Sequence, residues 1–397
     1  MAVEVRDDVL PEVLSWIEFK TEQAKRRMAF KAATLDIDCG RGCLGLLIPA
    51  HQGDVMIPVM PDPPEDFKGY LPNRLGPFLL QELHPHSRDS RLSFVEAEHQ
   101  YFIDGLPSLG SVTGLVHRFA EPFVPEVVID KMVTGSCWPR AQYLKEDVAD
   151  AISRVDSLFE VPELKTLVHE ITEAKLPSAM VCDRIKALGC RMPAIRELLY
   201  STVAMDSRAI MQKWEDCRDE ASGRGTYMHQ QFEYYLNRGV VDCAGPEMSS
   251  LLKYLSTLVG WCAYRTEWMI FGSDEWLAGC IDFAAIDASG SMMLVDWKRS
   301  RGLASKYKGY GRFMAGPLEH VPDCTGWRYR LQLNCYRYIL EKYYACEVSV
   351  MCVVCTHPEN TTFPFVDVVP HMFLETEAVM SHQRQLASQF ITSAESQ

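Results

Sequence analysis

The stretch from Arg265 to Ser300 constrains the fold of this chain more than any other part of the sequence. Its apolar runs, EWMIFG, WLAGCIDFAAID and MMLVDWK, are separated by short turns that contain Gly, Ser and Asp. Runs of this length and composition predict β-strands, and short turns between them predict antiparallel neighbours. The stretch therefore predicts three consecutive strands of one sheet.

Charged side chains interrupt two of these strands. Asp296 and Lys298 are two residues apart and so project from the same face of the third strand, while Asp282 lies near the middle of the second. Carboxylates on neighbouring strands, with the backbone carbonyl of Trp297 between them, are the hard oxygen ligands that Mg²⁺ prefers. Lys298 could orient an attacking water or stabilise developing negative charge. The alternative is an ordinary Asp-Lys ion pair at the end of a half-buried strand.

The composition limits the class of protein. With 397 residues and 47% hydrophobic content, the chain can bury the core of one elaborate domain or two modest ones. No apolar run approaches the roughly 18 residues of a membrane span, and the N-terminus resembles neither a signal peptide nor a clear mitochondrial transit peptide. We expect an intracellular protein, nuclear or cytoplasmic, with no membrane partner. The fourteen scattered cysteines predict reduced thiols rather than a disulfide framework.

The net charge of −13 argues against indiscriminate binding to polyanions, so any contact with nucleic acid must be local. The segment WKRSRGLASKYKGYGR, from Trp297 to Arg312, has six basic residues and no acidic ones, with Tyr307 and Tyr310 interleaved. Such a segment can neutralise phosphates and stack on bases. The alternative is a solvated loop.

Two helices flank the strands. His229 and Glu233 are four residues apart on a helix that is expected to open near Gly225 and close by Gly239. Gln332 and Tyr336 have the same spacing on a later helix, before a buried strand from about Val348 to Cys355. Either pair alone is ordinary in helices.

The positions of proline and glycine predict where secondary-structure elements and domains begin and end. A hairpin is expected at 92–106, followed by a helix capped by Ser111 or Thr113, and mostly helical structure over 123–220. Cys39 with Cys43, and Cys352 with Cys355, are interpreted as packed thiols, the latter pair on opposite faces of a strand. The predicted parts are an N-terminal extension at 1–56 with a helix at 10–35, a proline-rich linker at 57–90, a hairpin plus helical subdomain at 91–222, a core at 223–371 and a C-terminal helix at 372–397.

Taken together, GTYMHQQFE, Glu267, GCIDF, VDWKRS and QLNCY resemble the PD-(D/E)xK nuclease superfamily. They are most similar to its RecB-like branch, which includes CRISPR-associated nucleases and mitochondrial genome maintenance exonucleases. The resemblance covers about residues 92–370 and is most specific over 223–356. It implies an α/β (α+β) fold with a restriction-endonuclease-like core, in which a mixed central sheet is flanked by helices, with a helical insertion and an N-terminal extension.

The resemblance also assigns roles to residues. It implies a Mg²⁺ or Mn²⁺ cofactor bound by His229, Asp282, Asp296 and the Trp297 carbonyl, with Glu233 as a supporting partner of His229. Cys346, Cys352 and Cys355 fall within or just before a strand, so no iron–sulfur cluster of the kind found in some relatives is expected. The implied catalytic residues are Asp282, Asp296, Lys298 and Glu267, and the expected DNA-binding residues are Gln332, Tyr336, Arg299, Arg301, Lys306, Lys308, Tyr310 and Arg312.

The function expected from this combination is a metal-dependent DNA nuclease. Exonuclease action on single-stranded or frayed DNA ends, in repair, recombination or genome maintenance, is the first choice. The alternatives are a non-catalytic nucleic-acid-binding protein on the same fold and a nuclease that acts on RNA. A further alternative is an unrelated scaffold with accidental motifs, in which His229, Asp282, Asp296 and Lys298 would lie far apart.

Overall fold

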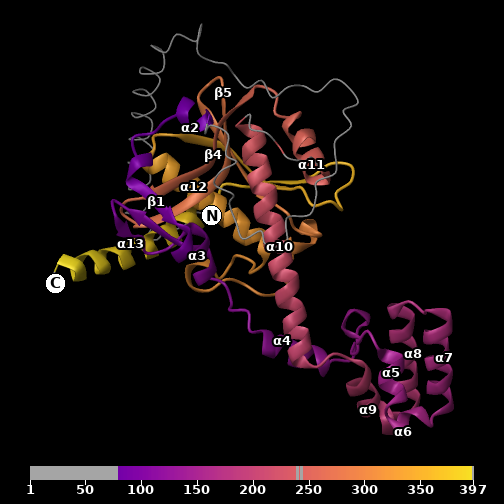
Figure 1. Ribbon diagram of the computed structural model, residues 1–397. Helices are drawn as coiled ribbons and strands as arrows, with labels where there is room; N and C mark the ends of the chain where they lie inside the picture. Colours follow the sequence, from indigo (N-terminus) through magenta and orange to yellow (C-terminus); the bar gives the residue numbers. More distant parts are fainter. Residues whose placement is uncertain (1–78, 238–240, 242–244, 396–397) are drawn as a thin grey trace, which may run out of the picture. The chain divides into compact units, whose positions relative to one another are not determined.

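A computed structural model describes residues 79–237, 241 and 245–395 (Figure 1). The predictions for the extension at 1–56, including its helix at 10–35 and Cys39 with Cys43, lie outside the described residues, as does the linker up to residue 78. The described chain divides into two compact units, one formed by residues up to Glu121 together with those from Gly223 onward, and one formed by Pro122–Ser222.

A five-stranded mixed sheet organises the first unit. Its strands lie in the order β4, β5, β6, β7 and β8, and only the β6–β7 pair is parallel. Helix α12 (Thr325–Tyr343) provides the crossover that a parallel pair requires. The three predicted strands and the strand near 348–355 are confirmed. The strand bounds are Trp261–Gly272, Leu277–Asp287, Ser291–Lys298, Glu347–Cys355 and Phe365–Val368.

Helices cover both faces of this sheet. On one face, Phe232 of α10 (Ser207–Leu236) packs edge-on against Trp297 of β6, with ring centres 5.6 Å apart, and α11 (Pro246–Leu255) adds Leu251 to the same cluster. On the other face lie α3 (Val112–Arg118), α12 and α13 (Phe373–Glu395). Cys352 packs in the first cluster and Cys355 in the second, which confirms that these buried thiols point to opposite faces.

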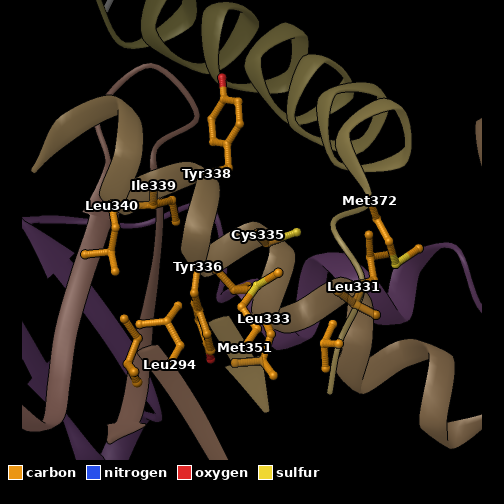
Figure 2. Close-up of a cluster of buried hydrophobic side chains, with 14 of the residues drawn as sticks. Leu294, Leu331, Leu333, Cys335, Tyr336, Tyr338, Ile339, Leu340, Met351 and Met372 are labelled. Carbon is orange, nitrogen blue, oxygen red and sulfur yellow. The ribbon is translucent and has the colours of Figure 1, made fainter. Parts of the chain in front are cut away.

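Figure 2 shows the core on the α12 face of the sheet. Tyr336 points from α12 toward Leu294 and Met351 of the sheet, whereas Tyr338 points the other way, toward α13. Because β6 and β7 are covered on both faces, their sequences are nearly continuous apolar runs. Asp296, only 2% exposed, interrupts the run in β6 and therefore needs a specific explanation.

Helix α10 runs without a break from Ser207 to Leu236, so the prediction that a helix opens near Gly225 is wrong about its start. A Cβ at Gly223 or Gly225 would meet nothing within 4 Å. A helical glycine costs only about 1 kcal/mol relative to alanine. The packing of Met228 and Phe232 against the sheet outweighs that cost.

The predicted boundary between linker, hairpin and helical subdomain is also corrected. Strands β1 (Leu92–Val95), β2 (Gln100–Ile103) and β3 (Leu106–Pro107) form the expected hairpin, extended by a third short strand. Leu92 and Ile103 pack against Phe271 of β4, so the hairpin belongs to the sheet's unit and not to the helical one. Ser111 caps α3 as predicted, accepting the Gly114 N–H at 3.0 Å.

The last part of the predicted linker is folded onto the sheet. Helix α2 (Leu79–Leu83) buries Leu80, whose N–H donates to the side chain of Asn237 at 3.0 Å. Further along, Arg265 of β4 donates to the carbonyl of His84 and to Asp89, both at 2.9 Å. The predicted linker, which rested on proline content alone, therefore extends too far toward the C-terminus, because residues from Leu79 onward are folded.

The second unit is helical, as predicted for 123–220. Three of its prolines, Pro125, Pro162 and Pro193, occupy the first turn of a helix, where the missing N–H has no cost. Within the described residues, no helix combines the length and apolarity needed to cross a membrane. The helices besides the start of α10 are α4 (Pro125–Val133), α5 (Val148–Ser153), α6 (Asp156–Phe159), α7 (Pro162–Ala174), α8 (Ser178–Arg191) and α9 (Pro193–Val203).

Candidate metal centre

The candidate site lies where β5 and β6 stop pairing. The last pair of their ladder is Phe283 with Val295, and each of these residues is the chain neighbour of one aspartate, Asp282 or Asp296. Beyond that pair, the carboxylate of Asp282 accepts the backbone N–H of Trp297 at 2.7 Å. A side chain thus replaces the backbone partner of this N–H, and the strands leave room for Asp282 between them.

Glu267 reaches the same place from β4. The pairs on either side of it, Thr266 with Phe283 and Trp268 with Ile281, place it opposite Asp282 in the register. Its φ of 40° lies in the left-handed region, where a non-glycine residue costs on the order of 1–3 kcal/mol. Strain of this kind concentrates at functional sites. The thiol of Cys280 donates to Glu267 Oε2 at 3.3 Å and steadies the carboxylate.

His229 projects from α10 toward both carboxylates. Its Nδ1 lies 3.5 Å from Glu267 Oε1 and 3.7 Å from Asp282 Oδ2, and its Nε2 lies 3.1 Å from the carbonyl oxygen of Trp297. A carbonyl can only accept, so Nε2 carries the hydrogen, and Nδ1 is the atom that faces the acids. This arrangement, with a backbone carbonyl fixing the tautomer, is typical of metal-binding histidines.

Asp296 and Lys298 form a buried ion pair beside this group. The Lys298 ammonium lies 2.7 Å from both oxygens of Asp296, with hydrogen-bond geometry toward Oδ1. Among the described residues, Oδ2 of Asp296 is buried without a hydrogen-bond partner. The ammonium also lies 4.7 Å from the ring centre of Tyr329, a residue of α12. It is thus held between a carboxylate and an aromatic face.

Burial and mutual charge shift the pKa values of these groups. Burial lowers the pKa of His229, but Asp282 and Glu267 outweigh it and raise that pKa to about 9. Burial raises the pKa of Asp296 to about 6, against the opposing effect of Lys298, and it also raises the pKa of Asp282. Burial lowers the pKa of Lys298, but Asp296 and Asp282 outweigh it and raise that pKa well above its usual value, so the amine stays charged. The cluster contains three carboxyl groups, those of Glu267, Asp282 and Asp296, but only two groups that can be cationic, those of His229 and Lys298.

This donor set fits a divalent cation. One ligand atom each from His229, Glu267 and Asp282 lie within 4.8 Å of one another, and carboxylate oxygens with one imidazole suit Mg²⁺ or Mn²⁺. The predicted ligand Asp296 lies next to this group but is paired with Lys298. The Trp297 carbonyl, also predicted as a ligand, instead accepts the His229 hydrogen and orients that ring. His229, Asp282, Asp296 and Lys298 are brought together, as accidental motifs would not be.

Three predicted supporting residues, Gln332, Tyr336 and Glu233, are wholly or partly buried. Tyr336 is 4% exposed, and a Cβ at Gly279 would stand 2.6 Å from its ring, so Tyr336 is packed beneath β5. Gln332 is half-buried and donates to the Tyr336 hydroxyl at 3.0 Å. The His229 ring contacts Glu267, Asp282 and Trp297, while Glu233 is buried one turn further along α10.

The basic segment after β6 has an anchored part and an exposed part. Arg299 pairs with buried Glu247 at 2.9 Å, and Lys306 donates to Ser300 at 2.8 Å. Tyr307, predicted as a stacking face, is instead half-buried, with the guanidinium of Arg330 4.7 Å from its ring centre. The exposed basic and aromatic members are Arg301, which pairs with Glu359 at 2.7 Å, together with Lys308, Tyr310 and Arg312.

Tyr329 and Cys280 also contact the site residues, and neither was predicted from the sequence. Cys280 is two residues before Asp282 on the same strand, and that spacing could have placed its thiol beside the site. Tyr329 lies one helical turn before Gln332, a weaker signal. The sequence matches no protein-family profile, and no curated protein is significantly similar to it.

Proposed function

We propose that this protein is a metal-dependent nuclease with a restriction-endonuclease-like core that hydrolyses phosphodiester bonds of DNA, acting from single-stranded or frayed ends. The observation that carries the proposal is the meeting of His229, Glu267 and Asp282 beside the Asp296–Lys298 pair. These groups come from one helix and three strands, and they lie partly buried, with Asp296 fully buried, at the point where β5 and β6 separate.

The residues divide the work according to their charge. A bound divalent cation would lower the pKa of a water and neutralise charge on phosphate oxygens. His229 Nδ1, Glu267 and Asp282 would hold that cation, and Asp296 lies beside them. Lys298, whose pKa is raised, keeps its positive charge and acts as a hydrogen-bond donor to the reacting phosphate or water rather than as a base. Asp296 and the Tyr329 ring fix the direction of the ammonium.

The main competing function is nucleic-acid binding without catalysis. Burying several carboxylates close together is costly, and the raised pKa values of Asp282 and Asp296 record that cost. A binding surface gains nothing from a strained, partly buried acid such as Glu267, whereas a hydrolytic metal site can use its carboxylate as a ligand. The same site chemistry would serve RNA, and an RNA substrate is therefore included beside DNA in the test.

The proposal is tested with end-labelled single-stranded DNA, duplex DNA and RNA, each incubated with Mg²⁺, Mn²⁺ or a chelator. We expect metal-dependent shortening of DNA from its ends. Lys298→Ala and Asp282→Asn should lower the rate by at least about 100-fold, the usual effect of losing one transition-state contact. Asp104→Asn, which removes an exposed partner of Arg91, is the matched control and should leave the rate unchanged. Degradation that survives Lys298→Ala, or that continues in chelator, would refute the proposal.

A further inference from the structure

The tip of the segment after β6 carries two large aromatic side chains in solvent. Tyr310 is 81% exposed and Phe313 is 54% exposed, although tyrosine and phenylalanine normally bury much of their surface. The basic residues Lys308 and Arg312 alternate with them and are exposed as well. We call residues 308–313 the aromatic tip.

The backbone holds this tip in a fixed turn. The Arg312 N–H donates to the Gly309 carbonyl at 2.9 Å, and the two residues between them, Tyr310 and Gly311, have φ values of 49° and 80°. Positive φ at both central positions is a type I′ turn, which favours Asn-Gly. Tyrosine in the first of these positions is strained, and strain is retained where a side chain has a task.

The base of the tip is anchored on both sides. Leu303 and Met314 are each 2% exposed, and the Met314 N–H donates to the Val321 carbonyl at 2.9 Å. A Cβ at Gly309 would stand 2.8 Å from Pro322, so the turn lies directly against the returning chain. The rings of Tyr310 and Phe313 are therefore presented by a supported turn rather than by a loose loop.

The charge around the tip selects the occupant. From Trp297 to Leu318 the chain has no acidic residue, and the exposed Glu319 is the first to follow, although the whole protein carries a net charge of −13. Nearby Asp323 is 1% exposed and paired with Arg328 at 2.6 Å, so it does not offset the local positive charge. Cations that alternate with exposed rings fit a polyanion whose flat bases are accessible, and in a duplex those faces are stacked away.

We infer that the aromatic tip binds an unpaired nucleic-acid strand, with Tyr310 and Phe313 stacking on bases while Lys308 and Arg312 contact phosphates. The inference deepens the proposed function and rests on it, since it names the strand form that reaches the metal centre. The segment that carries the tip begins at the residue after Lys298, the last residue of β6. A nucleic acid held at the tip is therefore bound by the loop that directly follows β6.

The test separates binding from cleavage. Full-length Lys298→Ala protein in chelator is titrated into a fluorescent oligothymidylate, an RNA of equal length and a blunt duplex. We expect single strands to bind more tightly than the duplex. Adding Tyr310→Asn, which suits the turn but removes the ring, should weaken single-strand binding about tenfold, the usual loss of one base stack. Tyr310→Phe should keep the affinity, and Phe363→Ala, which removes another exposed ring, is the control.

The outcomes distinguish the two proposals. If the protein without substitutions never cleaves nucleic acid, but single-strand binding still depends on the Tyr310 ring, this inference stands and the proposed nuclease activity is refuted. Cleavage by the unmodified protein, with binding that Tyr310→Asn does not weaken, would overturn only the inference. The inference would also be overturned if the protein bound duplex and single strands with equal affinity, or bound neither of them. A preference for RNA over DNA would keep the stacking role and change the substrate.

Discussion

The carboxylate of Asp282 accepts the backbone N–H of Trp297 at 2.7 Å and also lies 3.7 Å from the imidazole of His229. One side chain therefore completes the hydrogen bonding of the sheet and contributes to the candidate metal site. Substitutions can separate these two tasks.

Asp282→Asn should keep stability and lose metal binding. The amide oxygen can still accept the Trp297 N–H, and the burial that raises the pKa of Asp282 disfavours a charge at this position. Asp282→Ala leaves that N–H without a partner, at a cost of about 1–3 kcal/mol. Urea unfolding in chelator and Mn²⁺ titration measure the two effects. Equal destabilisation by both variants would show that the hydrogen bond is not what Asp282 supplies to the fold.

His229 should make the metal-free protein less stable at high pH. Its pKa is raised to about 9 from an ordinary 6.5, so its stabilising contribution is complete below pH 6.5 and is lost as pH rises through 9. The full contribution is on the order of 3 kcal/mol. The free energy of unfolding is measured in chelator from pH 6 to 10, with His229→Gln as the reference. A difference between the two proteins that does not shrink toward pH 10 would contradict this prediction.

Mn²⁺ should bind more tightly as pH rises toward 9. The proton on His229 Nδ1 occupies the position of a ligand lone pair, so metal and proton compete. Displacing one proton makes the affinity rise about tenfold per pH unit between 6 and 9. Below pH 6 the dependence should steepen, because the pKa of Asp296 is raised to about 6 and that carboxyl also gains a proton. Calorimetric titrations at several pH values check this, and His229→Gln should flatten the upper range.

Glu275 should be among the most destabilising positions to change. It is fully buried in the turn between β4 and β5, and it accepts from Lys342 and Arg384 at 3.1 Å each and from Tyr343 at 2.6 Å. Glu275→Ala leaves two cations without this partner and should cost about 3–5 kcal/mol. Glu377→Ala removes an exposed partner of the same arginine and should cost about 1 kcal/mol or less. Chemical denaturation compares the two, and similar losses would be unexpected.

Adding one methyl group should have opposite effects at two glycines. Gly279→Ala places a Cβ 2.6 Å from the ring of Tyr336 and 3.2 Å from Val112, and overpacking of this kind costs about 1–3 kcal/mol. Gly225→Ala, in helix α10, meets open space and should stabilise the protein by up to about 1 kcal/mol. Thermal unfolding of both variants checks the pair. A neutral Gly279→Ala would mean that Tyr336 moves freely, against its close packing.

The parts of the fold that were predictable from sequence are those in which neighbouring residues decide the outcome. The apolar runs around Asp282 and Asp296, bounded by short turns, indicated the strands, and an odd spacing placed Cys352 and Cys355 on opposite faces. The separation of Tyr307 from Tyr310, one half-buried and the other in solvent, depends on Arg330 far along the chain. For the same reason, no local signal revealed that Tyr336 is buried beneath Gly279.

Strand β6 pairs with β5 on one side and, in parallel, with β7 on the other, across the whole of α12. Long-range parallel pairing forms slowly, since the chain between the partners must be ordered first. We therefore expect the strand bearing Asp296 and Lys298 to remain an unpaired sheet edge during synthesis until residues 347–355 have left the ribosome. A nascent chain truncated before residue 347 would expose an unpaired sheet edge, so we expect the candidate metal centre to form only after residues 347–355 have been synthesised.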